Sequence, residues 1–238
     1  MATLFELIRD CRDELDDLSG DVDDPCAWES DDTGLLWTNA SLVRFANAAQ
    51  REFCRRTPIR DSDTAEICSI SVSPGQESIS YDSRVLFVER IKVAGETREL
   101  KKRTKEWIDD NFADWETNTG TPLYYIENFT QKTARLFPTP DAAITLELTV
   151  GRLPLEDMDW NLRAVVEPEI DLMSHEDLIL WMGHLALRKR DSQTYNKTES
   201  DRYFKLFETA AGPRISSWME RRRADLRALP RRTKPQPR

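Results

Sequence analysis

The chain has 238 residues, of which 39% are hydrophobic and 32% are charged, and its formal net charge is -9. This length allows one large domain or two small ones with a buried core. No apolar run approaches the ~20 residues that a membrane-spanning helix needs. Because the N-terminus is also acidic and amphipathic, we expect a soluble protein with no signal peptide and no membrane partner.

Charge is concentrated at the two ends of the chain. Residues 1–36 carry twelve acidic and two basic side chains, whereas residues 214–238 carry nine basic and two acidic ones. Two interpretations stay open at this point. Either both ends are simply solvated, or they meet partners of opposite charge.

The first 64 residues predict two helices. Residues 3–18 start with Thr3 and Glu6 at capping-box spacing. The expected apolar stripe of this helix comprises Leu4, Ile8, Cys11, Leu15 and Leu18. After a long loop, residues 37–57 predict a second helix that Thr38 caps and Pro58 ends. Its expected buried face comprises Leu42, Phe45, Ala46, Ala49 and Phe53, and its expected exposed face Arg44, Asn47, Gln50, Arg51 and Arg55.

Residues 65–152 read as strands rather than helices. The strand-like segments are AEICSISVS, ESISYD, VLFVERIKVAG, LYYIENF, TARLF and AITLELTV. One short helix is predicted from Thr104 to Trp115. Because the strands are close in sequence, hairpins are favoured over crossovers, and we expect an inserted antiparallel β-rich domain.

Helix returns after a connector at residues 153–173. Ser174 and Asp177 have capping-box spacing at the start of one helix, and a second runs from Thr194 to Ala211. Gly212 and Pro213 interrupt the pattern before a last helix that begins at Ile215. The sequence therefore predicts an α+β fold with an extended C-terminal arm. Its expected parts are a helical bundle of residues 1–64 and 153–229, a β-rich insertion at 65–152 and a basic tail at 230–238.

No catalytic constellation is evident in the sequence. His175-Glu176 resembles the opening of an HExxH zinc motif, but Ile179 occupies the position of the second histidine, and we expect His175 to be exposed. The four cysteines form no CxxC pair, which predicts reduced thiols in a cytoplasmic compartment. Phosphate-binding glycine loops and a GxSxG motif are also missing from the sequence. We therefore expect no enzyme activity, no catalytic residues, no metal and no cofactor.

The basic tail is the strongest candidate for a binding segment. Its cationic residues are Arg221, Arg222, Arg223, Arg227, Arg231, Arg232, Lys234 and Arg238. Such a cluster is typical of phosphate contact, but it has no interleaved aromatic residues and the rest of the chain is acidic. The tail serves equally well for weak DNA binding or for docking on an acidic protein.

The order of landmarks resembles the head-to-tail adaptor proteins of tailed bacteriophages, of the tail tubular or gatekeeper type. The landmarks are the helix WTNASLVRFANAAQREFCRR, the strand region with GTPLYY and RLFPTPD, and the helix pair HEDLILWMGHLALRKRDSQTYNKTESDRYFKLF. The resemblance covers about residues 35–212. The acidic segment before it and the arginine-rich tail after it lie outside the match.

The resemblance implies a structural virion protein in the phage neck, assembled in the host cytoplasm. Such adaptors form a ring, usually of twelve copies, between the portal and the tail nozzle or another tail protein. DNA leaves through the central channel without sequence-specific binding, and the C-terminal arm binds the portal. The eight basic tail residues are then the expected portal-binding residues. The alternative is a DNA-binding accessory protein that acts through the same basic tail.

Overall fold

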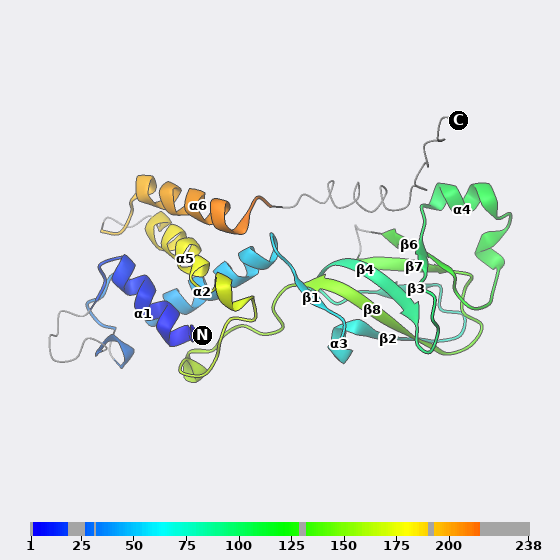
Figure 1. Cartoon of the computed structure of the whole chain (residues 1–238), viewed down its shortest axis with the longest axis horizontal. Helices are drawn as coiled ribbons and strands as arrows, with labels where there is room; N and C mark the ends of the chain where they lie inside the picture. Colours follow the sequence, from blue (N-terminus) through cyan, green and yellow to red (C-terminus); the bar gives the residue numbers. More distant parts are fainter. Residues whose placement is uncertain (1, 19–26, 31, 129–131, 190–192, 215–238) are drawn as a thin grey trace, which may run out of the picture. The chain divides into compact units, whose positions relative to one another are not determined.

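The computed structural model describes residues 2–18, 27–30, 32–128, 132–189 and 193–214, which form two compact units. The helical unit contains the described residues up to Ile59 together with Leu153–Arg214. The β unit, Arg60–Arg152, is inserted into the sequence of the helical unit (Figure 1). This arrangement confirms the α+β class, whereas the expected last helix and basic tail, residues 215–238, lie outside the described residues.

Helix α1, Leu4–Glu14, starts with the predicted capping box. The Glu6 side chain accepts a hydrogen bond from the Thr3 backbone N–H at 2.8 Å, and the Glu6 N–H donates to the Thr3 hydroxyl at 3.3 Å. The predicted place of Leu18 in the apolar stripe is wrong, since Leu18 is 40% exposed. The helix ends four residues earlier, and Asp16 at φ 52° turns the chain out of the helical path.

Helix α2, Asn39–Cys54, has the predicted N-cap, because the Thr38 hydroxyl accepts from the Ser41 N–H at 3.3 Å. The prediction that Asn47 and Gln50 are exposed is wrong, since both are buried. Asn47 donates to the backbone C=O of Met158 at 3.0 Å and accepts from its N–H at 2.8 Å. The Asn47 amide thus supplies the hydrogen bonds of the buried Met158 backbone, which is distant from α2 in the sequence.

Helices α5, Asp177–Arg188, and α6, Lys197–Ala211, complete the helical unit. Helix α5 packs against α1, α2 and α6, and α5 and α6 lie side by side in Figure 1. The common core comprises Leu4, Leu7, Ile8, Trp28, Leu42, Ala46, Phe53, Leu178, Met182 and Phe207, among others. Three short 3-10 helices lie in the connecting segments: η1, Ala27–Glu29; η3, Trp160–Leu162; and η4, Leu172–Ser174.

Two expectations at the start of α5 are corrected. The capping box at Ser174 is wrong, because Ser174 ends η4 and the N-cap of α5 is Glu176, which makes no side-chain cap bond. His175 is buried rather than exposed, and its Nε2 lies 3.2 Å from the C=O of Ile170. The tight η4 turn directs the His175 side chain toward the core. The periodicity of an α-helix does not predict this orientation, because η4 is a 3-10 helix.

A buried arginine joins three segments at the N-terminal end of α2. Arg12 donates to the Asp17 carboxylate at 2.5 Å and to the Trp37 C=O and the Asn39 side-chain oxygen at 2.8 Å each. Asn39 in turn donates to the Trp28 C=O at 2.7 Å. The end of α1, the segment around η1 and the start of α2 are therefore connected through one guanidinium group, whose donors suit several acceptors at once.

The β unit contains two four-stranded sheets. In the first, β8, Ile144–Arg152, pairs with β1, Ile59–Asp61; β2, Ser69–Val72; and β4, Val85–Val93. The second has the order β3-β7-β6-β5, with bounds Ser78–Ser80, Thr133–Phe137, Tyr124–Asn128 and Lys101–Lys102. The first four residues of the expected strand AEICSISVS instead form helix α3, Ala65–Cys68.

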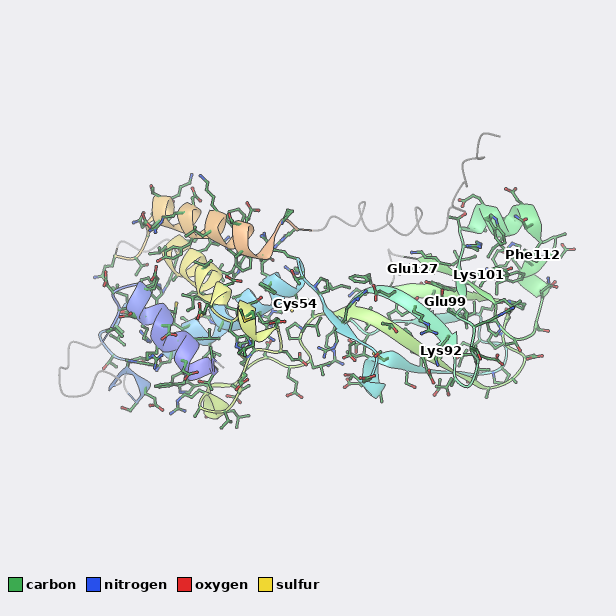
Figure 2. All side chains as sticks on the ribbon, in the orientation of Figure 1. Cys54, Lys92, Glu99, Lys101, Phe112 and Glu127 are labelled. Carbon is green, nitrogen blue, oxygen red and sulfur yellow. The ribbon has the colours of Figure 1, made fainter. Side chains whose placement is uncertain are left out.

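The expectation of a purely antiparallel insertion needs one correction. Strands β5 and β6 pair in parallel, and helix α4, Lys105–Asn111, lies between them in sequence. Just before β5, Glu99 bridges to Lys92 of β4, and the Leu100 N–H donates to the Ile91 C=O at 2.8 Å (Figure 2). The chain thus passes from the edge of one sheet to the edge of the other within four residues. So short a crossing leaves no turn signal in the sequence, and the hairpin rule therefore did not predict it.

Helix α4 is shorter than predicted. It ends at Asn111, Phe112 is extended, and Trp115 lies in a separate 3-10 helix, η2, Trp115–Thr117. Ile108 and Trp115 are nevertheless buried, around Phe137 of β7. The aromatic rings supply most of the apolar area here, so they hold the segment to the sheet even though the helix is interrupted.

A buried ion pair closes the β unit where the chain enters and leaves it. Asp61 accepts from Arg152 at 2.5 Å, from the Thr64 hydroxyl at 2.7 Å and from the backbone N–H groups of Asp63 and Thr64 at 2.9 and 3.1 Å. Burial alone raises the pKa of Asp61, but these hydrogen bonds outweigh it and hold the pKa well below its ordinary value of 3.8.

The change Asp61→Asn removes the charged acceptor of this pair, and we expect the free energy of unfolding to fall by about 3–5 kcal/mol at neutral pH. Because the folded pKa of Asp61 is depressed, its contribution is present above about pH 4 and is lost as pH falls further. Urea unfolding at pH 7 and pH 3 checks this. The difference between wild type and variant should shrink at pH 3, and an equal difference at both values would contradict the assignment.

Gly151 of β8 lies directly beneath an aromatic ring of β4. A Cβ at this position would approach Phe87 Cε1 and Cζ to 2.5 Å. We expect Gly151→Ala to lower stability by about 1–3 kcal/mol, because the ring must move out of its packed position. A thermodynamic cycle with Phe87→Ala, followed by thermal denaturation, provides the control. The double variant should lose less than the sum of the single changes, and strict additivity would show that the ring is not the obstacle.

Candidate functional site

The expected portal-binding residues lie outside the described part of the chain. They are Arg221, Arg222, Arg223, Arg227, Arg231, Arg232, Lys234 and Arg238. The structure does describe the segment that precedes them in the chain. Residues 212–214, here called the arm root, connect the end of α6 to the basic segment, and the root contacts the last turn of α2.

The first contact of the arm root is made by its backbone. Helix α6 ends at Ala211, and Gly212 follows at φ 77°, a conformation that favours glycine. The Gly212 C=O accepts a hydrogen bond from Arg56 Nη1 at 2.6 Å. A backbone group of the root is therefore held by a charged donor from the turn that follows α2, and such bonds are stronger than neutral ones.

The second contact is made by the Arg214 side chain. Arg214 Nε donates to Glu52 Oε1 at 2.6 Å, and its Nη2 donates to the other carboxylate oxygen, so the pair is bidentate. Glu52 also accepts from Arg56 Nε at 3.3 Å and from Arg55 at 3.4 Å. These residues come from the end of α2, where Cys54 is labelled in Figure 2.

Burial differs sharply across this cluster. The Glu52 side chain is 3% exposed, whereas that of Arg214 is 59% exposed. The Arg56 guanidinium is also buried and lies 4.9 Å from the ring centroid of Phe207 and 5.8 Å from that of Trp181. The carboxylate therefore sits in the body of the helical unit, with the buried cation of Arg56 on one side and the exposed cations of Arg214 and Arg55 toward the surface.

The protonation state of Glu52 follows from this arrangement. Burial raises the pKa of Glu52, but the hydrogen bonds and charges of Arg214 and Arg56 outweigh burial, so the pKa is lowered overall. The same contact raises the pKa of Arg214. Both groups are charged at neutral pH, and the site is suited to holding a guanidinium group rather than to transferring protons.

Sequence reasoning identified neither Glu52 nor Arg56 as a site residue. The spacing of the two, four residues apart on a predicted helix, is a signal for a side-chain pair. That spacing does not show burial. Arg214 follows Gly-Pro at a predicted helix end, 162 residues from Glu52, so only the tertiary structure brings the two together.

Part of the acidic N-terminal charge is used inside the helical unit. Asp17 accepts from Arg12, Glu29 accepts from Arg163 at 2.9 Å, and Asp32 accepts from the Asn39 N–H at 2.6 Å. The count of acidic residues in the sequence therefore overstates the negative charge that this end presents to a partner. The sequence left open whether the charged ends are simply solvated or meet partners of opposite charge. Simple solvation does not describe these three carboxylates, because each accepts a hydrogen bond within the helical unit.

The two histidines have structural contacts rather than a shared site. His184 of α5 lies 2.9 Å from the Ser200 hydroxyl of α6, and that hydroxyl donates to the His184 C=O at 2.9 Å. Both residues are buried, so the pair links two helices. Among the described residues, no three His, Cys, Asp or Glu side chains are grouped so that they could hold a metal ion. Cys11, Cys54 and Cys68 are buried and form no disulfide bond.

Comparison with known proteins gives a match for nearly the full length of the chain. The model of the SU10 adaptor protein family matches residues 2–233, which includes both units, the arm root and six of the eight basic tail residues. No curated protein matches the chain. Within its described part, no helix is long and apolar enough to cross a membrane. The chain therefore belongs to the SU10 adaptor protein family and is a phage head-to-tail adaptor protein.

Proposed function

We propose that this adaptor forms a ring, of twelve copies, between the portal and the tail nozzle, and that its C-terminal arm binds the portal. The family match over residues 2–233 is the observation that supports the proposal most directly, because it establishes a structural component of the phage neck. Assembly in the host cytoplasm, passage of DNA through the ring during ejection and the absence of enzyme activity belong to the same proposal.

The surface of the helical unit supports contact between copies. Met173 is 88% exposed and Val165 is 74% exposed, and Leu162 and Leu172 are also exposed. All four lie in the connector between the β unit and α5. Uncovered apolar side chains are common singly, but four within twelve residues suit a surface that a neighbouring subunit covers. In a ring, each subunit contacts its two neighbours through two different faces. The face that covers these apolar residues therefore need not carry an apolar group of the same kind.

Charge supports passage of DNA without retention. The chain has a net charge of -9, and residues 214–238 contribute +7, so the remainder carries -16. A body of this charge repels the phosphate backbone, which allows DNA to move past it. The basic arm is then free to meet acidic groups of a protein partner, where arginine forms forked hydrogen bonds with carboxylates.

A truncation tests the role of the arm. We expect a variant that ends at Arg214, and so retains the arm root, to lose stable attachment to portal-bearing heads. Each exposed ion pair contributes only about 0–1 kcal/mol, so attachment depends on many copies acting together. Co-sedimentation of purified adaptor with heads measures this, and raising the salt concentration should weaken the intact complex.

A charge variant is the matched control for this truncation. It keeps the full length but replaces by glutamine the arginines at 221, 222, 223, 227, 231 and 232. Loss of attachment in both variants would assign the contact to charge, and loss in the truncation alone would assign it to the length or shape of the arm. Stable attachment of the truncated protein would overturn the portal-binding role.

A gel shift separates the proposal from DNA binding through the tail. We expect no stable complex between the full-length protein and linear duplex DNA at physiological salt, because the acidic body opposes the basic arm. The truncated protein serves as the reference without the arm. A tight complex that disappears on truncation would favour the DNA-binding alternative.

A further inference from the structure

We propose that Glu52 and Arg56 form a clamp that fixes the place at which the C-terminal arm leaves the helical unit, and that this clamp sets the strength of partner binding. The second half of the statement rests on the proposed function, in which the arm binds the portal. The first half concerns the arm root alone and can be tested without a partner.

The clamp holds two residues of the arm root, Gly212 and Arg214, through two separate contacts. Arg56 holds the backbone C=O of Gly212, and Glu52 holds the side chain of Arg214 through two hydrogen bonds. Pro213 lies between them, and its ring restricts its own φ. The direction of the chain after α6 is therefore determined by the last turn of α2 and the two residues after it, and not by a continuation of α6 itself.

The clamp can open without leaving a buried charge unpaired. Arg214 is the exposed member of the cluster, whereas Glu52 and Arg56 are both buried and bonded to each other. If Arg214 leaves, the Glu52 carboxylate keeps Arg56 as its cation. Breaking most buried ion pairs is strongly destabilising because one charge is left without a partner, and this arrangement avoids that penalty.

Fixing the arm root favours binding because it lowers the entropy that the arm loses on association. A segment that already leaves the body in the bound direction needs fewer groups to be ordered by the partner. Opening the clamp should therefore weaken the binding of one arm about tenfold, which corresponds to about 1.4 kcal/mol. In a ring, this change is multiplied over several arms.

A double-mutant cycle tests the clamp. Glu52→Gln leaves the arm sequence intact, and Arg214→Ala leaves the body intact, so the two changes share only the contact between them. Arg55→Ala is the matched control, because Arg55 reaches Glu52 only through a single 3.4 Å contact from the surface. The local readout is the backbone order parameter of residue 214 by NMR. The functional readout is the dissociation constant for portal-bearing heads.

We expect the order parameter of residue 214 to fall from about 0.85 in the wild type and in the Arg55→Ala control to below about 0.6 in both single variants. The double variant should be no more mobile and no weaker in binding than either single variant. Thermal denaturation checks folding. If Glu52→Gln proves unstable, Arg214→Ala alone decides the test, since its side chain is exposed.

The outcomes separate the clamp from the proposed function. An unchanged order parameter in Arg214→Ala overturns the clamp, whatever the arm binds. If both single variants loosen the root but bind heads as the wild type does, while truncation at Arg214 abolishes binding, the portal role stands and the influence of the clamp on affinity is refuted. If truncation has no effect on attachment, the portal-binding role of the arm fails. In that case, a more mobile residue 214 in both single variants still supports the clamp on the arm root.

Discussion

A buried arginine–carboxylate pair lies at each end of helix α2, and the helical unit depends on these two pairs. At the N-terminal end, Arg12 and Asp17 join α1, the segment around η1 and the start of α2. At the C-terminal end, Arg56 and Glu52 join α2 to the end of α6 and the arm root. Charges inside a protein are costly unless they are paired, so each pair favours one arrangement of the segments around it.

Within the described part of the helical unit, the buried charges serve the packing of the fold. The described carboxylates of the helical unit that are buried serve as acceptors for structural arginines and backbone groups, and the Ser200 hydroxyl is used to link α5 and α6. The adaptor family places the molecule between phage head and tail components. Ion pairs that join segments distant in the sequence resist the separation of those segments.

The β unit uses the same principle at its base. The pair of Asp61 and Arg152 lies where the chain enters and leaves the unit, so the first and last strands are joined where sequence continuity alone would leave them separate. Elsewhere the unit relies on buried apolar side chains, which are mostly aliphatic, with aromatic packing around Phe137. Charged contacts therefore hold the points where segments meet, and apolar contacts supply most of the buried area.

The sequence by itself determined the elements whose signals are local. The capping box of Thr3 and Glu6, the Thr38 cap and the buried face of α2 follow from spacing, because helix ends and helix faces depend on residues within one or two turns. The order of landmarks over about residues 35–212 also sufficed to show the resemblance to phage adaptors, which the family match confirms. Only the tertiary structure decided that Asn47 is buried against Met158, that β5 pairs in parallel with β6, and that Glu52 holds Arg214. Each of these depends on a partner that is remote in sequence or on a short crossing between sheets, and no periodic pattern records which distant group will satisfy a buried polar atom.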